Sequence, residues 1–317
     1  MWNSINKKLI IRLAFAVIAM PSWSMAQEPA STPMDGVPSE AVSSGRSSAD
    51  IPFWSPARVN WQQREVENRE PSIRFPGPDK ANYPNSPYTL PAGRSYIEIL
   101  PLSFSGQTPD TTSNYNVEFL LRHGITDWLE FRIFSAGLNV SLARDDIPQQ
   151  VGFVPITFDI KMHIFDEKKE WLLPAFGIEI ALQTSWGSPH LQSGIQPSMY
   201  LLFDHSLAFD FLFEWNVGIV WSRDATGVDY QQVSYQFALS RDLVPGLNLF
   251  TQAYINDANL GVAGPFVRPT VPGTAIVVGG GFLWTVNDLV AIFASGGAGV
   301  SSSAPESVAQ GGIAFAF

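Results

Sequence analysis

From residue 91 to residue 317, apolar and polar residues alternate with a period of two, and this pattern constrains the fold more than any other feature of the chain. In residues 153–165, for example, Ile156, Phe158 and Ile160 share one face, whereas Asp159 and Lys161 share the other. Successive side chains of a strand point to opposite faces of a sheet. Each such run therefore predicts a strand with one apolar and one charged face.

About twelve runs of this kind follow one another, and most are near the roughly 9–11 residues that a tilted strand needs to cross a bilayer. Long connections tend to alternate with short ones, as they do in outer-membrane barrels. A soluble sandwich would instead turn its polar face outward and would need covered edges. We therefore predict an all-β fold, a transmembrane antiparallel up-and-down β-barrel of about 12 strands. The runs comprise residues 95–105, 114–122, 128–140, 153–165, 171–183, 197–204, 208–221, 232–240, 247–256, 275–284, 288–300 and 308–317.

The N-terminus has the pattern of a secretory signal peptide. Lys7, Lys8 and Arg12 precede an apolar run that ends at Met20, and Ser24 and Ala26 then lie at small-residue cleavage positions. This order predicts a signal peptide over residues 1–26 that is cleaved after Ala26; a retained anchor helix is the alternative. Beyond it, no apolar stretch reaches the length of about 18 residues that indicates a helical membrane span.

Residues 27–90 differ in composition from the rest of the chain. They are rich in Pro, Ser and Gly without a period, which is typical of an extended, largely irregular segment. The repeated prolines break any hydrogen-bonded ladder, although Phe53, Trp54, Trp61 and Phe75 lie among them. We predict a periplasmic segment that either docks against something larger or acts as a tether. The barrel is then expected to occupy residues 91–317.

The last residues of the chain continue the alternation, with Ile313, Phe315 and Phe317 on one face. An aromatic side chain left in water gains nothing, but on the outside of a barrel it contacts lipid. We therefore expect the cell outer membrane to be the location of the chain and its lipid to be one partner. By resemblance to outer-membrane barrels generally, Phe317 is also expected to be part of the signal that the barrel assembly machinery reads.

The opposite face of the runs carries charges that would line the lumen of a barrel. In the hairpin of residues 116–133, pairing across a short turn would place Glu118 opposite Arg132, or Arg122 opposite Glu130. We expect a hydrated, mildly cation-favouring lumen; alternatively, these charges neutralise one another and brace the interior. The predicted lumen charges are seven acids and three bases: Glu98, Glu118, Arg122, Glu130, Arg132, Asp159, Lys161, Glu179, Asp210 and Glu214.

No catalytic residue, metal site or cofactor is predicted. The sequence has no cysteine, and His123, His163, His190 and His205 lie in neither a nucleophile elbow nor a zinc-binding pair. The consecutive glycines that begin at Gly279 lie within a strand run and lack the helix N-terminus of a phosphate-binding loop. The formal charge of -10 argues against nucleic acid as a partner. An enzyme is therefore not expected.

The segments YNVEFLLRHGITDWLEFRI and VVGGGFLWTVNDLVAIFASGGAGVSSSAPESVAQGGIAFAF resemble the family named after the MetA pathway of phenol degradation. The resemblance covers roughly residues 94–317 and rests above all on the hairpin around Gly124, Ile125, Thr126 and Asp127. Because members are outer-membrane β-barrel transporters, it implies a porin-like channel for passive uptake of small solutes, with aromatic or hydrophobic compounds as candidates. The alternative is a structural or surface-interaction barrel with an occluded lumen, which the strand count leaves open.

Overall fold

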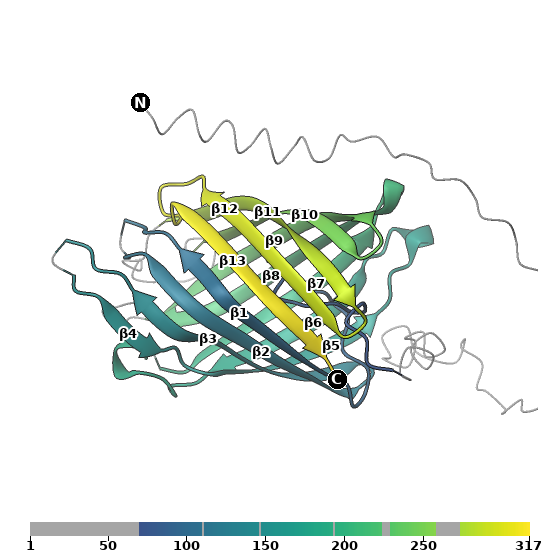
Figure 1. Ribbon diagram of the computed structural model, residues 1–317, viewed down its shortest axis with the longest axis horizontal. Helices are drawn as coiled ribbons and strands as arrows, with labels where there is room; N and C mark the ends of the chain where they lie inside the picture. The colour runs from purple at the N-terminus through teal and green to yellow at the C-terminus, as the bar shows by residue number, and fades with distance from the viewer. Residues whose placement is uncertain (1–69, 110, 146, 193, 224–228, 258–272) are drawn as a thin grey trace, which may run out of the picture. The chain divides into compact units, whose positions relative to one another are not determined.

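The computed structural model describes residues 70–109, 111–145, 147–192, 194–223, 229–257 and 273–317, which form a ring of tilted strands (Figure 1). Over these residues the chain is all-β, with a closed antiparallel barrel of 12 strands and 4% helix. The predicted fold class is therefore confirmed. The predicted signal peptide, residues 1–26, lies outside the described residues.

The strands agree with the predicted runs in number and order, with one addition and several shifted ends. Three short 3-10 turns, η4 (Lys169–Trp171), η5 (Pro189–Leu191) and η6 (Ala208–Asp210), lie in the connections. The strands are β1 (Ser95–Ser105), β2 (Asn114–Thr126), β3 (Leu129–Ser141), β4 (Gln150–Phe153), β5 (Thr157–Phe165), β6 (Ala175–Gln183), β7 (Gln196–Ser206), β8 (Phe211–Arg223), β9 (Asp229–Val244), β10 (Leu247–Asp257), β11 (Ala275–Asn287), β12 (Val290–Gly299) and β13 (Ser307–Ala316).

The strands pair with their neighbours along the chain, and β13 pairs with β1 to close the ring. The added strand is β4, which pairs with residues 138–141 of β3, whereas β5 pairs with residues 129–134 of the same strand. The prediction of one unbroken strand over residues 153–165 is therefore wrong. Pro155 has no N–H to donate to a ladder, so the chain leaves the sheet between Phe153 and Thr157.

The seam of the barrel joins the first strand to the last. Tyr96 lies opposite Ala316, and the N–H of Phe317 donates to the Ser95 carbonyl at 2.9 Å. Ala316 is buried on the inward face of β13, so its neighbour Phe315 points outward. Phe317 itself is more than half exposed. The closing strand thus has small residues inside and aromatic residues outside, which is the arrangement of a lipid-facing strand.

Large apolar side chains are exposed on the outer wall of the barrel, where they alternate with buried inward residues. Several are more than a third exposed: Ile99, Leu121, Phe131, Ile160, Ile180 and Met199. An outward band of this kind is what a barrel presents to hydrocarbon. None of the helices in the described ranges is both long and apolar enough to span a membrane.

A row of aromatic rings crosses four adjacent strands on this outer wall. Phe165, Phe176, Phe203 and Trp215 lie on β5, β6, β7 and β8, and successive ring centroids are 5.4, 5.1 and 4.0 Å apart. All four lie near the ends of the strands that meet at short connections. Such a row matches one aromatic girdle of a barrel at the membrane interface.

Residues 70–92, which we call the strap, precede β1 and run inside the ring of strands (Figure 1). Their hydrogen bonds reach β1, β3, β6, β7, β8 and β10, on different sides of the barrel. A segment that contacts all of these strands has to cross the lumen. Of the two predicted roles, the described part of the segment has that of a docked strip.

The composition of the strap explains why it joins no ladder. Prolines lack an N–H and fix φ, so a segment that contains six of them within about twenty residues cannot extend a sheet. Apolar side chains anchor it instead, because Ile73, Ala81 and Leu90 are buried in a cluster with Tyr96 and Phe293 of the wall. The prolines are Pro71, Pro76, Pro78, Pro84, Pro87 and Pro91.

Candidate functional site

The register of the strands sets which charges face the strap. Antiparallel partners share a face, so the pairing of Glu130 with Lys161, and of Lys161 with Glu179, puts all three side chains on the inner wall. The same parity continues from β1 to β8. Of the predicted lumen charges, those on the inner wall are buried Glu98, Arg122, Glu130, Arg132, Asp159, Lys161, Glu179 and Glu214, together with half-buried Glu118.

Asp210 departs from this set. The sequence predicted a strand from residue 208, but β8 begins at Phe211 and the three preceding residues form η6. Phe209 and Asp210 have φ values of 62° and 59°, in the left-handed region that no strand uses. The alternation therefore begins only at Phe211, and Asp210 is an exposed turn residue, not a lumen charge.

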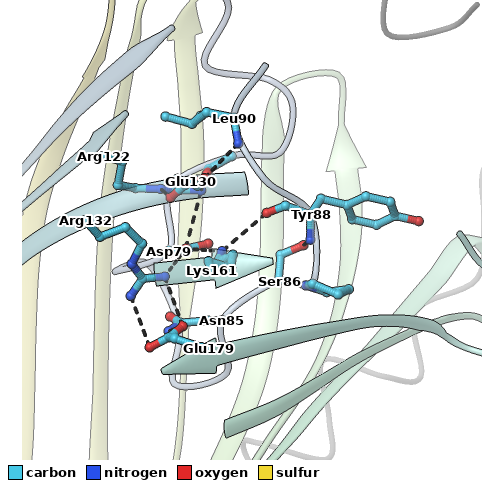
Figure 2. A network of polar contacts seen from close by, with 12 residues as sticks. Asp79, Asn85, Ser86, Tyr88, Leu90, Arg122, Glu130, Arg132, Lys161 and Glu179 are labelled. Atoms are coloured by element: carbon cyan, nitrogen blue, oxygen red, sulfur yellow. Dashed lines mark hydrogen bonds and ion pairs between the residues drawn. The ribbon is translucent and has the colours of Figure 1, made fainter. Parts of the chain in front are cut away.

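Asp79 of the strap is the centre of the site. One of its oxygens, Oδ2, lies 2.9 Å from Arg132 Nη1 and 3.4 Å from Arg122 Nη2, and it also bonds Lys161 Nζ. These three bases project from β2, β3 and β5 toward the strap (Figure 2). Three wall cations thus share one strap carboxylate, which also separates cations that would otherwise repel one another.

The charged surroundings keep Asp79 ionised. Burial by itself would raise the pKa of this carboxyl group, but Arg122, Lys161 and Arg132 together hold the pKa below its ordinary value. A buried, paired carboxylate costs about 3–5 kcal/mol when one partner is removed, because the remaining charges stay buried without a counter-ion. These ion pairs therefore anchor the strap firmly to the wall.

Arg122 links the strap to two acids of the wall. Its Nε donates to Glu130 Oε1 at 2.6 Å and its Nη1 to Glu98 Oε1 at 3.2 Å, while the same Nη1 donates to the Gly77 carbonyl at 2.8 Å. Arg132 extends the network across the lumen, with Asp159 at 2.9 Å and Glu179 at 3.0 Å. The ionic network is continuous from β1 to β6.

The pairing of the β2–β3 hairpin differs from both predicted registers. Arg122 lies opposite Arg132, and Gly124 lies opposite Glu130, because an irregularity between Gly124 and Thr126 shifts the ladder near the turn. The side chains of Arg122 and Glu130 still meet as diagonal neighbours. The two arginines can face each other because Asp79 lies between them.

The wall acids also bind the backbone of the strap. Glu98 accepts the N–H groups of Asp79 at 3.1 Å and Lys80 at 2.8 Å, and Glu130 accepts the N–H of Leu90 at 2.7 Å. A carboxylate that accepts backbone N–H groups makes a charge-assisted hydrogen bond. The irregular strap therefore has its donors satisfied by side chains, in place of the ladder that its prolines exclude.

Neutral side chains of the strap reach the remaining acids. Asn85 Nδ2 donates to Glu179 at 2.7 Å, Asn82 Nδ2 donates to Glu214 at 2.7 Å, and Ser86 Oγ donates to Asp204 at 3.1 Å. On the far side, the N–H of Tyr83 donates to Gln252 Oε1 at 2.9 Å. The strap is thus tied to β6, β7, β8 and β10.

Two cavities remain beside the strap. One, of about 380 Å³, is lined by residues near the short connections, including Gly246 and Thr285. The other, of about 350 Å³, is lined by residues at the opposite strand ends, including Gln183 and Gln196. Asp79 and Asn82 line both cavities. The middle of the strap therefore lies between the two cavities.

The sequence did not identify two residues of the site. Asp204 lies on the inward parity of the run over residues 197–204, so the alternation could have found it. Asp79 offered no such signal, because the strap has no period and its role depends on residues of β2, β3 and β5. The wall charges gave no indirect signal either, because the predicted lumen already carried seven acids for the three bases.

The comparisons with known proteins bear on the fold. No family model matches the chain, and no curated protein matches it. Among solved structures, the barrel is similar to an outer membrane channel from Pseudomonas putida F1, with a TM-score of 0.56 and 11% identity over 74% of this chain and 99% of that one. This similarity supports the outer-membrane barrel fold alone.

A second solved structure is the translocator domain of the autotransporter NalP from Neisseria meningitidis. It has a TM-score of 0.46 and 11% identity over 82% of this chain and 99% of that chain. At that TM-score the similarity carries no argument about this chain.

Proposed function

We propose that the chain is an outer-membrane channel for small polar solutes, in which the strap narrows the lumen. The carrying observation is the pair of cavities near opposite strand ends, which share Asp79 and Asn82 in their linings. A route through the barrel would require the strap to move where it lies between them. The fold that the chain has in common with a solved outer membrane channel is consistent with this role.

The outer surface supports the membrane location. Exposed apolar side chains alternate with inward polar ones along the strands, and a row of four aromatic rings lies near one end of the barrel. Such a surface is stable only against hydrocarbon. We also propose that residues 1–26 direct export, that the chain before the strap is periplasmic, and that the assembly machinery recognises Phe317.

The lining of the lumen favours polar solutes. The cavity of about 350 Å³ presents Gln183, Gln196, Ser198 and Gln236 between the charged groups. A hydrophobic or aromatic compound, which the family resemblance implies, would leave these groups without partners when it displaced water. A small hydrated solute would keep them satisfied. We therefore propose sugars and organic cations of low mass in preference to aromatic compounds.

The charge of the interior adds a preference among ions. Counting the strap, the described residues inside the barrel include nine acids (Asp79, Glu98, Glu118, Glu130, Asp159, Glu179, Asp204, Glu214 and Asp242) and five bases (Arg74, Lys80, Arg122, Arg132 and Lys161). The difference, 9 − 5, is a net charge of −4 when all of them are ionised. A narrow passage with this excess is expected to admit cations in preference to anions.

A structural barrel with an occluded lumen is the second candidate. It is favoured by the buried ion pairs of Asp79, which hold the strap across the lumen without any ligand. In this case the polar network would brace the wall, and the outer loops would carry any interaction.

Two measurements on the full chain distinguish the candidates. In planar bilayers, a channel should show openings with a reversal potential of cation-favouring sign in a salt gradient. In a liposome swelling assay, arabinose should enter faster than the larger raffinose. Protein that is folded by circular dichroism, yet shows neither openings nor swelling, would overturn the channel and favour the occluded barrel.

A further inference from the structure

Most acids in the lumen have a counter-ion. Among the described residues, an arginine or lysine lies within salt-bridge distance of Asp79, Glu98, Glu118, Glu130, Asp159 and Glu179. Asp204 and Glu214 have no such partner in the described part of the chain, although they are only 5% and 8% exposed. Their charges therefore have to be compensated in another way.

These two acids lie directly opposite each other on β7 and β8. Directly paired residues have Cβ atoms about 4.5–5.5 Å apart, so two carboxylates at such positions repel each other. Burial strengthens the repulsion, because less water is present to screen it. The pair is therefore unfavourable by itself and is a natural position for a positive ligand.

The strap supplies only neutral donors to this pair. Ser86 Oγ donates to Asp204 Oδ2, and Asn82 Nδ2 donates to Glu214 Oε2. The other oxygen of Asp204, Oδ1, is buried without a hydrogen-bond partner. The strap thus orients both carboxylates from one side and leaves acceptor capacity on the other.

Asn216 gives an independent indication of a ligand. It is 1% exposed, lies two residues after Glu214 on the inward face of β8, and its Oδ1 is also buried without a hydrogen-bond partner. It pairs with Leu202, which places it diagonally across from Asp204. Its Nδ2 donates to Gln236 at 3.4 Å, so the amide is held by its nitrogen and the oxygen keeps its acceptor capacity. A buried acceptor oxygen beside two acids is suited to a cation.

We propose that Asp204, Glu214 and Asn216 form a binding site for a divalent cation of the Ca²⁺ class. Ca²⁺ prefers carboxylate and amide oxygens and accepts water for its remaining ligands. Two carboxylates match its charge, and Glu214 and Ser86 line the cavity of about 380 Å³, through which the ion would enter. The bound ion joins β7 to β8 and, through Asn82 and Ser86, to the strap. This site does not depend on whether the barrel conducts.

The test measures the unfolding temperature of the full chain in detergent after treatment with EDTA. CaCl2 is titrated at an ionic strength held constant with NaCl, and MgCl2 is titrated in parallel. The expected result is a saturable rise of a few degrees with CaCl2, because a ligand of the native state raises its stability by mass action. Calorimetry on the same sample should give about one Ca²⁺ per chain.

Substitutions locate the site. The double variant Asp204→Asn with Glu214→Gln should be more stable than the parent chain in EDTA, since the repulsion is gone, and should show no calcium response. Asn216→Leu should weaken calcium binding about tenfold, and this variant remains informative if the double variant fails to fold. The control is Glu118→Gln, whose acid is paired with Lys80 at 2.9 Å and whose loss should leave the calcium response intact.

Three results would overturn the proposal. One is the absence of a saturable response to CaCl2 and to MgCl2 in the parent chain. Another is a calcium response that persists unchanged in the double variant, which would place the binding on other acids. The third is stability that falls with rising pH and ignores CaCl2, which would mean that the two acids share a proton.

Discussion

The two sides of the inner wall differ in the charges that they present to the strap. From β1 to β8, inward positions carry the acids and bases that bind it through ion pairs and hydrogen bonds. From β10 to β13, the described inward positions carry no charge and include Gln252, Gly281, Ser295 and Gln310. One side of the lumen therefore holds the strap through charges, whereas the other, which we call the neutral side, contacts it through Gln252 and the apolar cluster around Phe293.

The neutral side leaves room beside the strap. The cavity of about 380 Å³ is lined by Ser240, Asn248, Phe250 and Thr285 of β9, β10 and β11, by the strap, and by the acids Glu214 and Asp242. Among the described residues no salt bridge joins the strap to β9, β10 or β11, and the polar contact on this side is the hydrogen bond from the Tyr83 N–H to Gln252 of β10. In the proposed channel, solutes would pass along the side of β10 to β13, while the charged side holds the strap in place.

Removal of the strap should have the largest effect. A variant that lacks residues 71–90 loses the segment that divides the two cavities, and its wall keeps every ladder of the barrel. We expect it to fold and to conduct several times better than the full chain in planar bilayers. An unchanged conductance would show that the strap does not occlude the lumen. Failure of the variant to fold would show that the strap is an integral part of the barrel.

The substitution Asp79→Asn should loosen the strap on the charged side. It leaves Arg122, Arg132 and Lys161 without their shared carboxylate, at a cost of about 3–5 kcal/mol for a buried pair. We expect longer or more frequent openings in single-channel records and faster cleavage of the strap by added protease. Conductance and cleavage equal to those of the parent chain would contradict this role of Asp79.

Asp288→Asn is the matched control for that substitution. Asp288 also forms an ion pair with the strap, at 2.6 Å from Arg74, but the two side chains are 70% and 54% exposed. Exposed pairs contribute about 0–1 kcal/mol. The control should therefore change neither the openings nor the rate of cleavage.

Ion selectivity should respond to the bases of the charged side. Replacement of Arg122 and Arg132 by Gln removes two positive charges from a lumen that already has an excess of acids, so the cation-to-anion permeability ratio should rise. Reversal potentials in a KCl gradient measure this ratio, and circular dichroism checks that the variant folds. An unchanged ratio in a folded variant would mean that ions pass only along the neutral side.

The alternation identified the strands well because the period of two is a local property of the chain. The alternation gave wrong strand bounds where a proline or a left-handed backbone conformation interrupts the strand. Pro155 divided one predicted strand, and the positive φ of Phe209 and Asp210 delayed another. The register of the β2–β3 hairpin was also missed, since the irregularity after Gly124 has no sequence pattern of its own. As a result, Asp210 was wrongly predicted to line the lumen, and Arg122 has Arg132 as its cross-strand neighbour.

The strap shows a second limit of the sequence. Its prolines correctly indicated an irregular segment, but composition does not tell where an irregular segment lies. Its position depends on the contacts that Asp79 makes with the wall. The bases it contacts, such as Arg122 and Lys161, are 43 and 82 positions further along the chain. Only the tertiary fold brings these residues together. The sequence could therefore predict the charges of the wall, but not Asp79 at the centre of the site.

The smallest effect we predict concerns the neutral side, where glycines allow close approach. Gly281 lies opposite Phe250, and a Cβ added there would meet the Ala294 carbonyl oxygen at 2.2 Å and Phe250 Cζ at 2.7 Å. Gly281→Ala should therefore destabilise the barrel by about 1–3 kcal/mol through overpacking. Gly296→Ala is the control, because its nearest neighbour would be the Val308 carbonyl oxygen at 3.5 Å. Urea unfolding in detergent measures the stability of both variants. Equal stability would mean that the backbone around Gly281 shifts to accept the added Cβ, which would contradict the predicted overpacking.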